Sequence, residues 1–327
     1  MDGTTASLDK LELLAKVAGL YFEEGQSQSD IALQTGYSRS MISRFLAEAR
    51  DLGVVEIRVN YPLARRTDLE GELEQALGLK VVRILRSGTL SYSQMLRRLG
   101  SLAARLVEEI IYDGMTIGLS WGTGLWETVN AIRAGAASNC RVVQMIGALG
   151  TTDTEIDGPE LARRLARLLI GHYSTLPAPL IVDDEVTRQG LMAGQRLRRI
   201  FEQFNGIDLA LVGVGTVAPE RASLLRAGYL DLAQLEALQA AGAVGDVCAI
   251  HFTHDGEILD TGLTRCVVGI DANGLRAIPL RLGIAGGQFK SLPIIGASRA
   301  GLINMLVTDE VAAIGILQEL KKHAEQV

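Results

Sequence analysis

Beyond residue 79 the chain alternates short apolar runs with longer stretches of helical periodicity, and this alternation restricts the fold more than any other feature. Helical stretches at 92–112, 124–134 and 158–171 separate the first of the apolar runs. Each apolar run is rich in Val and Ile and ends near Gly or Asp. The seven runs are residues 80–85, 115–120 and 140–147, followed by LPAPLIV, IDLALVGVG, AVGDVCAIHF and CVVGID. Strands that alternate with helices in this way predict a doubly wound α/β sheet.

The first sixty residues follow a different pattern, in which three helices precede a short strand. Residues 8–24 carry apolar side chains at helical spacing. A short second helix is expected to begin near residues 27–29 and to be broken at Thr35-Gly36. A third helix runs over residues 39–53, behind Ser38, which is a good N-cap. Residues 54–59 alternate as in a strand, and we expect this first domain to end at residue 62.

Residues 28–47, QSDIALQTGYSRSMISRFLA, fit the twenty-residue helix-turn-helix pattern. Ala32 is small where the two helices would cross, and Gly36 stands at the turn, where a positive φ is required. The apolar residues of the pattern, which would form its core, are Ile31, Tyr37, Ile42 and Phe45. This pattern favours a DNA-binding unit, and the alternative is a three-helix module for protein contact.

The exposed face of the second helix of this pattern is the candidate DNA-reading surface. It carries Arg39, Ser40, Ser43 and Arg44, and begins at Ser38. Arginine binds guanine or phosphate in a bidentate manner, and serine reaches either a base or the backbone. The strand at 54–59 would form a wing, on which Arg58 either touches a phosphate or stays a solvated charge.

The charge distribution supports this assignment, although the whole chain has a net charge of -6. DNA contact depends on local charge rather than on the average of the molecule. Residues 37–66 hold six arginines against three acids, a net charge of +3. Such an asymmetry favours a nucleic-acid footprint in this segment.

Another helix is expected from Thr67, because Thr67 and Glu70 have the spacing of a capping box. Leu69, Leu73 and Leu77 follow at i, i+4 and i+8 and form one apolar stripe. The stripe either packs against the large domain, which we expect at 63–327, or forms a contact between two chains.

The segment 116–129, TIGLSWGTGLWETV, predicts a strand, a Gly-rich loop and the start of a helix. Backbone N–H groups at Gly122, Thr123 and Gly124 would point outward at a helix N-terminus, and Ser120 and Thr123 add hydroxyl groups. Such an arrangement attracts a phosphate or another anion. The glycine spacing matches neither the dinucleotide nor the nucleoside-triphosphate motif. A tight structural turn is the alternative.

Four further residues are candidates for ligand contact. Gly213 and Gly215 in LVGVGT follow an apolar strand, and strand ends surround the ligand crevice of open α/β sheets. Asp246, expected at the beginning of a strand, could accept hydrogen bonds from ligand hydroxyls. Lys290 follows three glycines and could neutralise a phosphate. The alternatives are a sharp turn at the glycines, a turn-forming aspartate and a surface lysine.

The sequence offers little support for catalysis or a metal. His251 and His254 are three residues apart, but no third His close in the sequence completes a metal set. No nucleophile elbow or convincing carboxylate pair occurs. Cys140, Cys248 and Cys266 are widely spaced and are expected to be free buried thiols. We expect no cofactor, metal or membrane span, and a cytoplasmic location.

Taken together, these stretches resemble the SorC family of transcriptional regulators over almost the whole chain. The resemblance rests on the helix-turn-helix segment, on GLSWGTG, LVGVGT and AVGDV, and above all on GIAGGQFKSLPIIGASRAGLINMLVTDEVAA, which includes Thr308-Asp309-Glu310.

The resemblance implies a winged helix-turn-helix domain at 1–62, and a sugar-binding and oligomerisation domain at 63–327 with the fold of sugar-phosphate isomerases and deaminases. Operator DNA and a sugar or sugar phosphate would be the partners, in a dimer or tetramer. By motif, the residues at the phosphate end would be Ser120, Trp121, Gly122, Thr123, Gly124 and Lys290. Gly213 and Gly215 would line the pocket, and Asp246 would meet hydroxyls. A sugar-phosphate isomerase or deaminase with a regulatory head remains the alternative function.

Overall fold

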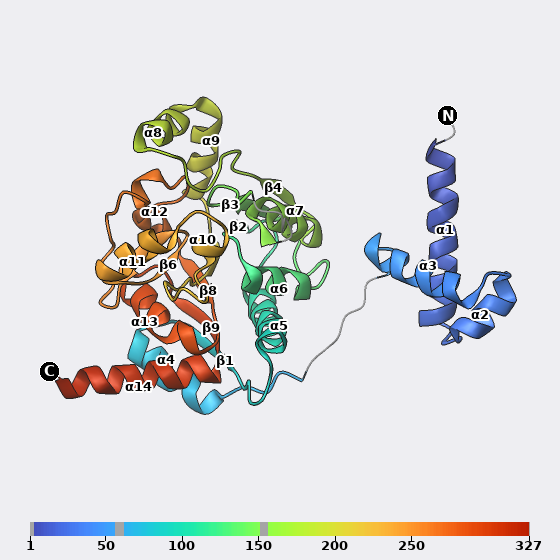
Figure 1. Cartoon of the computed structure of the whole chain (residues 1–327), viewed down its shortest axis with the longest axis horizontal. Coiled ribbons are helices and arrows are strands. Elements are labelled where there is room, and N and C mark those ends of the chain that lie inside the picture. The colour runs from blue at the N-terminus through green and yellow to red at the C-terminus, as the bar shows by residue number, and fades with distance from the viewer. Residues whose placement is uncertain (1–2, 56–61, 151–155, 327) are drawn as a thin grey trace. The chain divides into compact units, whose positions relative to one another are not determined.

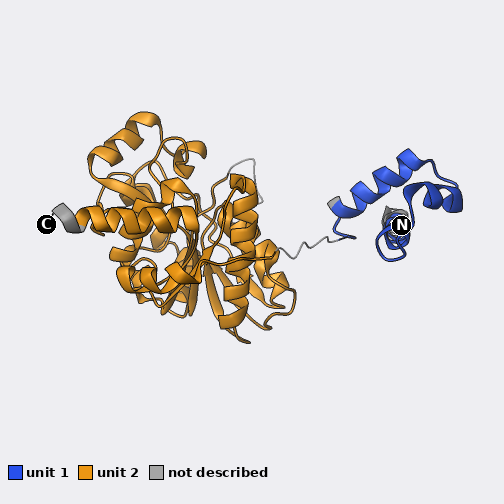
Figure 2. Cartoon of the chain, turned by 90° about the horizontal axis from the view of Figure 1, so that it is seen from below, with its two compact units in different colours: residues 1–60 blue, residues 61–327 orange. Residues whose placement is uncertain are grey.

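The computed structural model describes residues 3–55, 62–150 and 156–326. The chain divides into two compact units, residues 1–60 and 61–327 (Figure 2). Each unit has its own apolar core. No helix among the described residues is both long and apolar enough to cross a membrane.

The small unit consists of the helices α1 (Gly3–Phe22), α2 (Gln28–Thr35) and α3 (Arg39–Asp51). Ser27 and Ser38 cap α2 and α3, each accepting a hydrogen bond from the backbone N–H three residues on. Gly36 ends α2 with φ 77°, so the helix-turn-helix geometry is present. The fully buried core includes Leu14, Val17, Ile31 and Ile42. The expected wing and Arg58 lie outside the described residues, except that Val54 and Val55 pack against this core.

The large unit is built on a seven-stranded sheet in which every strand pair is parallel. In spatial order the strands are β1 (Val81–Leu85), β9 (Met305–Asp309), β8 (Leu280–Ile284), β5 (Leu209–Gly213), β2 (Thr116–Leu119), β3 (Arg141–Gln144) and β4 (His172–Ser174). From β2 the chain adds strands in one direction, and from β5 in the other. The predicted doubly wound α/β fold is therefore confirmed, with its switch point between β2 and β5.

Helices cover both faces of the sheet (Figure 1). Along β5, Leu209 and Leu211 face one apolar core, and Ala210 and Val212 face the other. The first core is closed by α5 (Tyr92–Ile110), α6 (Thr123–Ala131) and α7 (Gly158–Leu168). The second is closed mainly by α4 (Thr67–Leu77), α11 (Leu232–Ala240), α12 (Ala272–Ala277), α13 (Ser291–Arg299) and α14 (Glu310–Gln326).

The run AVGDVCAIHF is not one strand but a hairpin of β6 (Ala243–Val247) and β7 (Ile250–Thr253). Its turn lies at Cys248 and Ala249, which adopt positive φ values of 54° and 59°. The apolar residues 247–250 conceal such a turn, because neither Cys248 nor Ala249 is a turn former. The runs LPAPLIV and CVVGID form isolated bridges rather than strands, among them Ile181 to Val267.

The remaining elements are short and were not expected from the apolar pattern. They are α8 (Glu185–Ala193), α9 (Gln195–Phe204), α10 (Ser223–Arg226) and the 3-10 turns η2 (Thr264–Cys266) and η3 (Gln288–Lys290). The three cysteines are free thiols, and Cys266 is only half-buried.

The expected capping box at the start of α4 is not formed, because Arg66 occupies the N-cap position and no side chain caps the helix. Glu70 instead is buried and accepts hydrogen bonds from the Arg65 guanidinium and from the Ile84 N–H, at 2.9 Å. Glu74 likewise accepts from the Val82 N–H at 2.8 Å. The two carboxylates thus satisfy the Val82 and Ile84 N–H groups on the outer edge of β1, which no other described strand covers; residues 64–66 pair with the end of the same edge. The stripe of Leu69, Leu73 and Leu77 packs against the core of the large unit.

We expect Glu70→Ala to lower the free energy of unfolding of the large unit by about 1–3 kcal/mol, because it leaves the Ile84 N–H and the Arg65 guanidinium without their acceptor. Both tryptophans, Trp121 and Trp126, belong to this unit, so their fluorescence during urea unfolding of the full chain reports on it. Glu72→Ala, at an exposed position of the same helix, is the control. Equal unfolding midpoints for the two variants would contradict the assigned role of Glu70.

Candidate functional site

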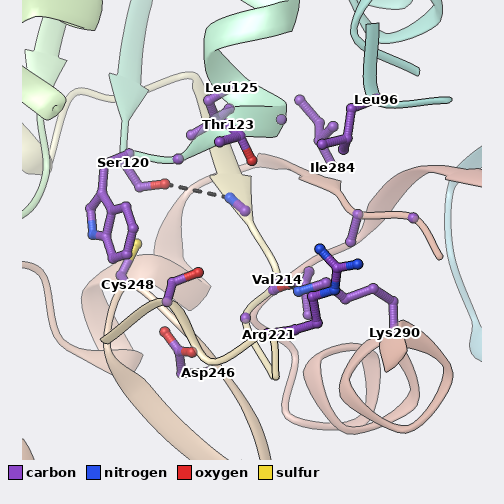
Figure 3. Close-up of a pocket in the computed structure, with 18 of the residues that line it drawn as sticks. Leu96, Ser120, Thr123, Leu125, Val214, Arg221, Asp246, Cys248, Ile284 and Lys290 are labelled. Atoms are coloured by element: carbon purple, nitrogen blue, oxygen red, sulfur yellow. Dashed lines mark hydrogen bonds between the residues drawn. The ribbon is translucent and has the colours of Figure 1, made fainter. Parts of the chain in front are cut away.

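One cavity lies at the carboxyl ends of β2, β5 and β8, where the strand order reverses (Figure 3). The empty space between its walls is about 760 Å³, and this value includes space that is open to solvent. The structure brings all nine sequence-predicted ligand residues into its lining, namely Ser120, Trp121, Gly122, Thr123, Gly124, Gly213, Gly215, Asp246 and Lys290. These residues come from four separate segments of the chain.

The N-terminus of α6 forms one wall of the cavity. Gly122 is the N-cap with φ 125°, a conformation that favours glycine, and no side chain caps the helix. The first backbone N–H groups of α6, at Thr123, Gly124 and Leu125, belong to residues that line the cavity. Uncapped N–H groups and the helix dipole together favour a negatively charged ligand group here.

Lys290 brings a cation into the same cavity from η3, and its Nζ donates a hydrogen bond to Val214 O at 2.6 Å. Burial lowers the pKa of Lys290 to about 8. The Asp246 carboxylate opposes this shift, whereas Arg226 and Arg221 add to it through repulsion. The ammonium group is therefore charged at neutral pH but incompletely compensated, a condition that an anionic ligand would relieve.

Asp246 lies within β6 rather than at the beginning of a strand, and its backbone and side chain are both fixed. Asp246 O accepts from the Gly215 N–H at 2.7 Å, and its carboxylate accepts from the Ala249 N–H at 3.2 Å. A Cβ atom at position 215 would lie 1.9 Å from Asp246 Oδ1, so this close approach requires glycine. At position 213 a Cβ atom would meet only Trp121 O at 3.6 Å, an ordinary contact.

Ser120 is buried at the end of β2, and its Oγ accepts a weak hydrogen bond from the Gly213 N–H at 3.4 Å (Figure 3). Cys248 lies nearby in the cavity wall, where burial raises the pKa of its thiol. The thiol therefore stays protonated and lacks the thiolate character of a nucleophile.

Sequence reasoning missed the two arginines of the cavity, Arg221 and Arg226. The Arg221 guanidinium stacks on the ring of Tyr92, 4.3 Å from its centroid, and Arg226 donates to Ser223 Oγ at 3.4 Å. With Lys290 and Asp246 they give the cavity lining a net charge of +2. The signal that was available is a pair of arginines eight and thirteen residues after Gly213, the glycine that ends β5.

The predicted DNA-reading residues lie together on one face of α3. Arg39, Ser40, Ser43 and Arg44 are exposed, whereas Ile42 and other residues of the opposite face are buried. Ser38 is also exposed, but its Oγ accepts from the Met41 N–H at 3.2 Å as the N-cap of α3. Its first role is therefore to start the helix.

The histidines lie outside the cavity lining. His251 is buried on β7, where burial lowers its pKa. His254, Asp255 and His323 form the one group of three possible metal ligands found among the described residues. The Arg299 guanidinium lies 3.0 Å from His254 Nδ1 and 3.1 Å from Asp255 Oδ1, so a positive charge already occupies this position.

Comparisons with known proteins agree with this architecture. A family model described as "Putative sugar-binding domain" matches residues 61–318. The sorbitol operon regulator of Klebsiella pneumoniae is 30% identical over 307 residues, which is 93% of this chain and 97% of that protein. The deoxyribonucleoside regulator of Bacillus subtilis is 29% identical, over 95% of this chain and 99% of that protein.

The relationship extends to three dimensions. The crystal structure of the full-length sorbitol operon regulator SorC from Klebsiella pneumoniae matches with a TM-score of 0.73, covering 94% of this chain and 98% of that chain. The match therefore includes both the small unit with its helix-turn-helix and the large unit with its cavity. The chain belongs to the SorC family of transcriptional regulators, in which a sugar-binding domain follows an N-terminal helical unit.

Proposed function

We propose that the cavity of this regulator binds a phosphorylated sugar or sugar derivative, and that ligand binding changes the affinity of α3 for operator DNA. The observation that carries the proposal is the convergence of the uncapped α6 N-terminus with Lys290, Arg221 and Arg226 in one cavity of net positive charge. An isolated helix N-terminus attracts any anion, but with three cations beside it the favoured ligand carries a dianionic group such as a phosphate ester.

The remaining polar groups suit the uncharged part of such a ligand. The Asp246 carboxylate accepts hydrogen bonds, which sugar hydroxyls donate, and Ser120 and Thr123 contribute hydroxyl groups. Trp121 offers an apolar face against which a carbon skeleton packs. Relatives named for a sorbitol operon and for deoxyribonucleosides support a carbohydrate or a carbohydrate-derived ligand.

For the other half of the function, we propose that residues 1–62 bind double-stranded operator DNA and residues 63–327 bind the ligand and assemble the oligomer. Arg39, Ser40, Ser43 and Arg44 would enter the major groove, while Ser38 fixes the start of α3. Two such heads in a dimer would read a roughly palindromic operator. Ligand binding acts on this affinity by favouring one arrangement of the oligomer.

We propose that the chain has no enzymatic activity, since the relatives are regulators and the cavity holds no thiolate or acid–base pair in hydrogen-bond contact among its described residues. The alternative, an isomerase or deaminase, requires turnover of the bound sugar phosphate. Incubation of the full chain with glucose 6-phosphate, ribose 5-phosphate and glucosamine 6-phosphate, followed by product analysis, distinguishes the two.

Lys290→Gln is expected to abolish most of the thermal stabilisation that the tightest-binding member of a sugar phosphate panel gives to the wild type, because the cation is removed from the phosphate end. Operator binding without ligand should persist. Lys80→Gln, at an exposed lysine that does not line the cavity, is the matched control. Equal stabilisation of Lys290→Gln and the wild type would remove Lys290 from the site.

The affinity for an anionic ligand should fall as the pH rises through about 8, where the Lys290 ammonium of the free protein loses its proton. Ligand binding favours the charged form, so the affinity is greatest below this pKa and declines above it, by at most about tenfold per pH unit for one linked proton. A phosphate ester is already dianionic above about pH 7. Calorimetry between about pH 7 and 9.5 should show this decline in the wild type and a flatter profile in Lys290→Gln.

Arg39→Ala and Arg44→Ala should each weaken specific operator binding by about 1–3 kcal/mol if the arginine contacts a base, and should reduce the salt dependence if it contacts phosphate. Gel shifts with promoter DNA at several salt concentrations separate these cases. Lys16→Ala, at an exposed position of α1, is the control for a loss of charge alone. Unchanged affinity in both arginine variants would show that α3 does not read DNA.

A further inference from the structure

We propose that Asp309 and Glu310 couple the cavity to the segment through which the chain enters the large unit, and so transmit ligand binding toward residues 1–60. This inference rests on the proposed function, because it concerns the regulation of the same site. The two carboxylates are consecutive in the chain, at the end of β9 and the beginning of α14. Asp309 binds Gly287, next to the cavity lining, and Glu310 binds Arg66, in the segment through which the chain enters the large unit.

The Asp309 carboxylate is completely buried and joins three segments. It accepts hydrogen bonds from the Gly287 N–H at 2.7 Å and from Ser87 Oγ at 2.9 Å. It also accepts longer bonds from the first backbone N–H groups of α14, at Val311 and Ala312. A buried carboxylate with four donors is held firmly, so a displacement of any one segment is transmitted to the other two.

On the cavity side, Gly287 lies between two residues of the cavity lining, Gly286 and Lys290. Lys290 N donates to Gly287 O at 3.1 Å, which closes η3, while Lys290 Nζ donates to Val214 O. An anion in the cavity competes with Val214 O for the ammonium group, since a charged acceptor binds it more strongly than a carbonyl does. Movement of Lys290 toward the anion would therefore displace η3 and Gly287.

On the other side, Glu310 holds the chain entry. Its carboxylate accepts from the Gly88 N–H and from Arg66 Nη1 at 3.2 Å. The side chains of Arg66 and Glu310 are only 23% and 15% exposed, so solvent screens this ion pair incompletely. Arg66 N also donates to Ile84 O at 2.9 Å, which places the residue at the edge of β1. Arg66 is the N-cap residue of α4 and directly precedes this first helix of the large unit.

Arg66 has a second carboxylate partner, and this provides an internal comparison. Its guanidinium also binds Asp68 in a bidentate manner, with a shortest distance of 2.7 Å. The Asp68 side chain is 60% exposed, however, and among the described residues it makes no hydrogen bond to α14 or to residues 286–290. Removal of Asp68 weakens the hold on Arg66 locally. Removal of Glu310 disconnects Arg66 from the segment that contacts the cavity.

The test compares Glu310→Gln with Asp68→Asn in the full chain. Three quantities are measured for each: affinity for the sugar phosphate that stabilises the wild type most, affinity for operator DNA, and the ratio of operator affinities with and without that ligand. We expect both variants to keep the first two. In Asp68→Asn the ratio should stay at its wild-type value, for which about 5- to 150-fold is typical of coupled sites. In Glu310→Gln it should fall toward one.

Arg66→Gln should give the same loss, and the double variant with Glu310→Gln should lose no more than either single one. Hydrogen exchange adds a readout that needs no DNA, with inorganic phosphate as the minimal probe. In the wild type, saturating phosphate should slow exchange at 121–126 and alter it at 62–68, and only the second effect should vanish in Glu310→Gln.

A wild-type ratio retained in Glu310→Gln, or an unaltered segment 62–68 in wild type while 121–126 is protected, would overturn the coupling role. Failure of the proposed function looks different, because then no sugar phosphate or inorganic phosphate protects 121–126 in the wild type, or the wild type does not bind promoter DNA.

Discussion

The parallel pairing of β5 with β2 on one side and β8 on the other is the constraint on which the candidate site depends. Parallel strands end at the same edge of a sheet, so the loops that follow these three strands must converge. Because the chain leaves β2 in one direction and β5 in the other, no crossover helix fills the space between them. The cavity is thus a consequence of topology, and the glycines allow the backbone to approach it closely.

Part of this arrangement could be predicted from the sequence. Four of the seven Val/Ile-rich runs form the parallel strands β1, β2, β3 and β5, whereas β4, β8 and β9 lie outside the predicted runs. Glycines after β2 and β5 indicated where a ligand would lie. Ser38 and Gly36 determine the limits of α3 and α2 through local hydrogen bonding and a positive φ, which sequence patterns detect well. The nine predicted ligand residues meet in one cavity. Eight of them lie at the end of β5 or in the segments that follow β2, β5 and β8, and the ninth, Asp246, is hydrogen-bonded to Gly215 just after β5.

Other features could not be predicted, because they depend on tertiary contacts. Arg221 enters the cavity through its stacking on Tyr92, a residue 129 positions earlier, and no local pattern indicates this contact. Glu70 has the spacing of a capping box but accepts a hydrogen bond from β1 instead. The buried Ile84 N–H needs a protein acceptor, whereas water can satisfy the N–H groups at an exposed helix end. The hairpin of β6 and β7 was hidden because Cys248 and Ala249 are poor turn residues.

That turn has a further consequence. Two consecutive L-residues in the left-handed region cost free energy that an Asn-Gly pair at the same place would not. The Cys248 side chain forms part of the cavity wall. Asparagine at this position would place an amide there that needs hydrogen-bond partners, and cysteine avoids this requirement. The hairpin therefore accepts a less favourable backbone conformation and places a small, uncharged side chain in the wall of the cavity.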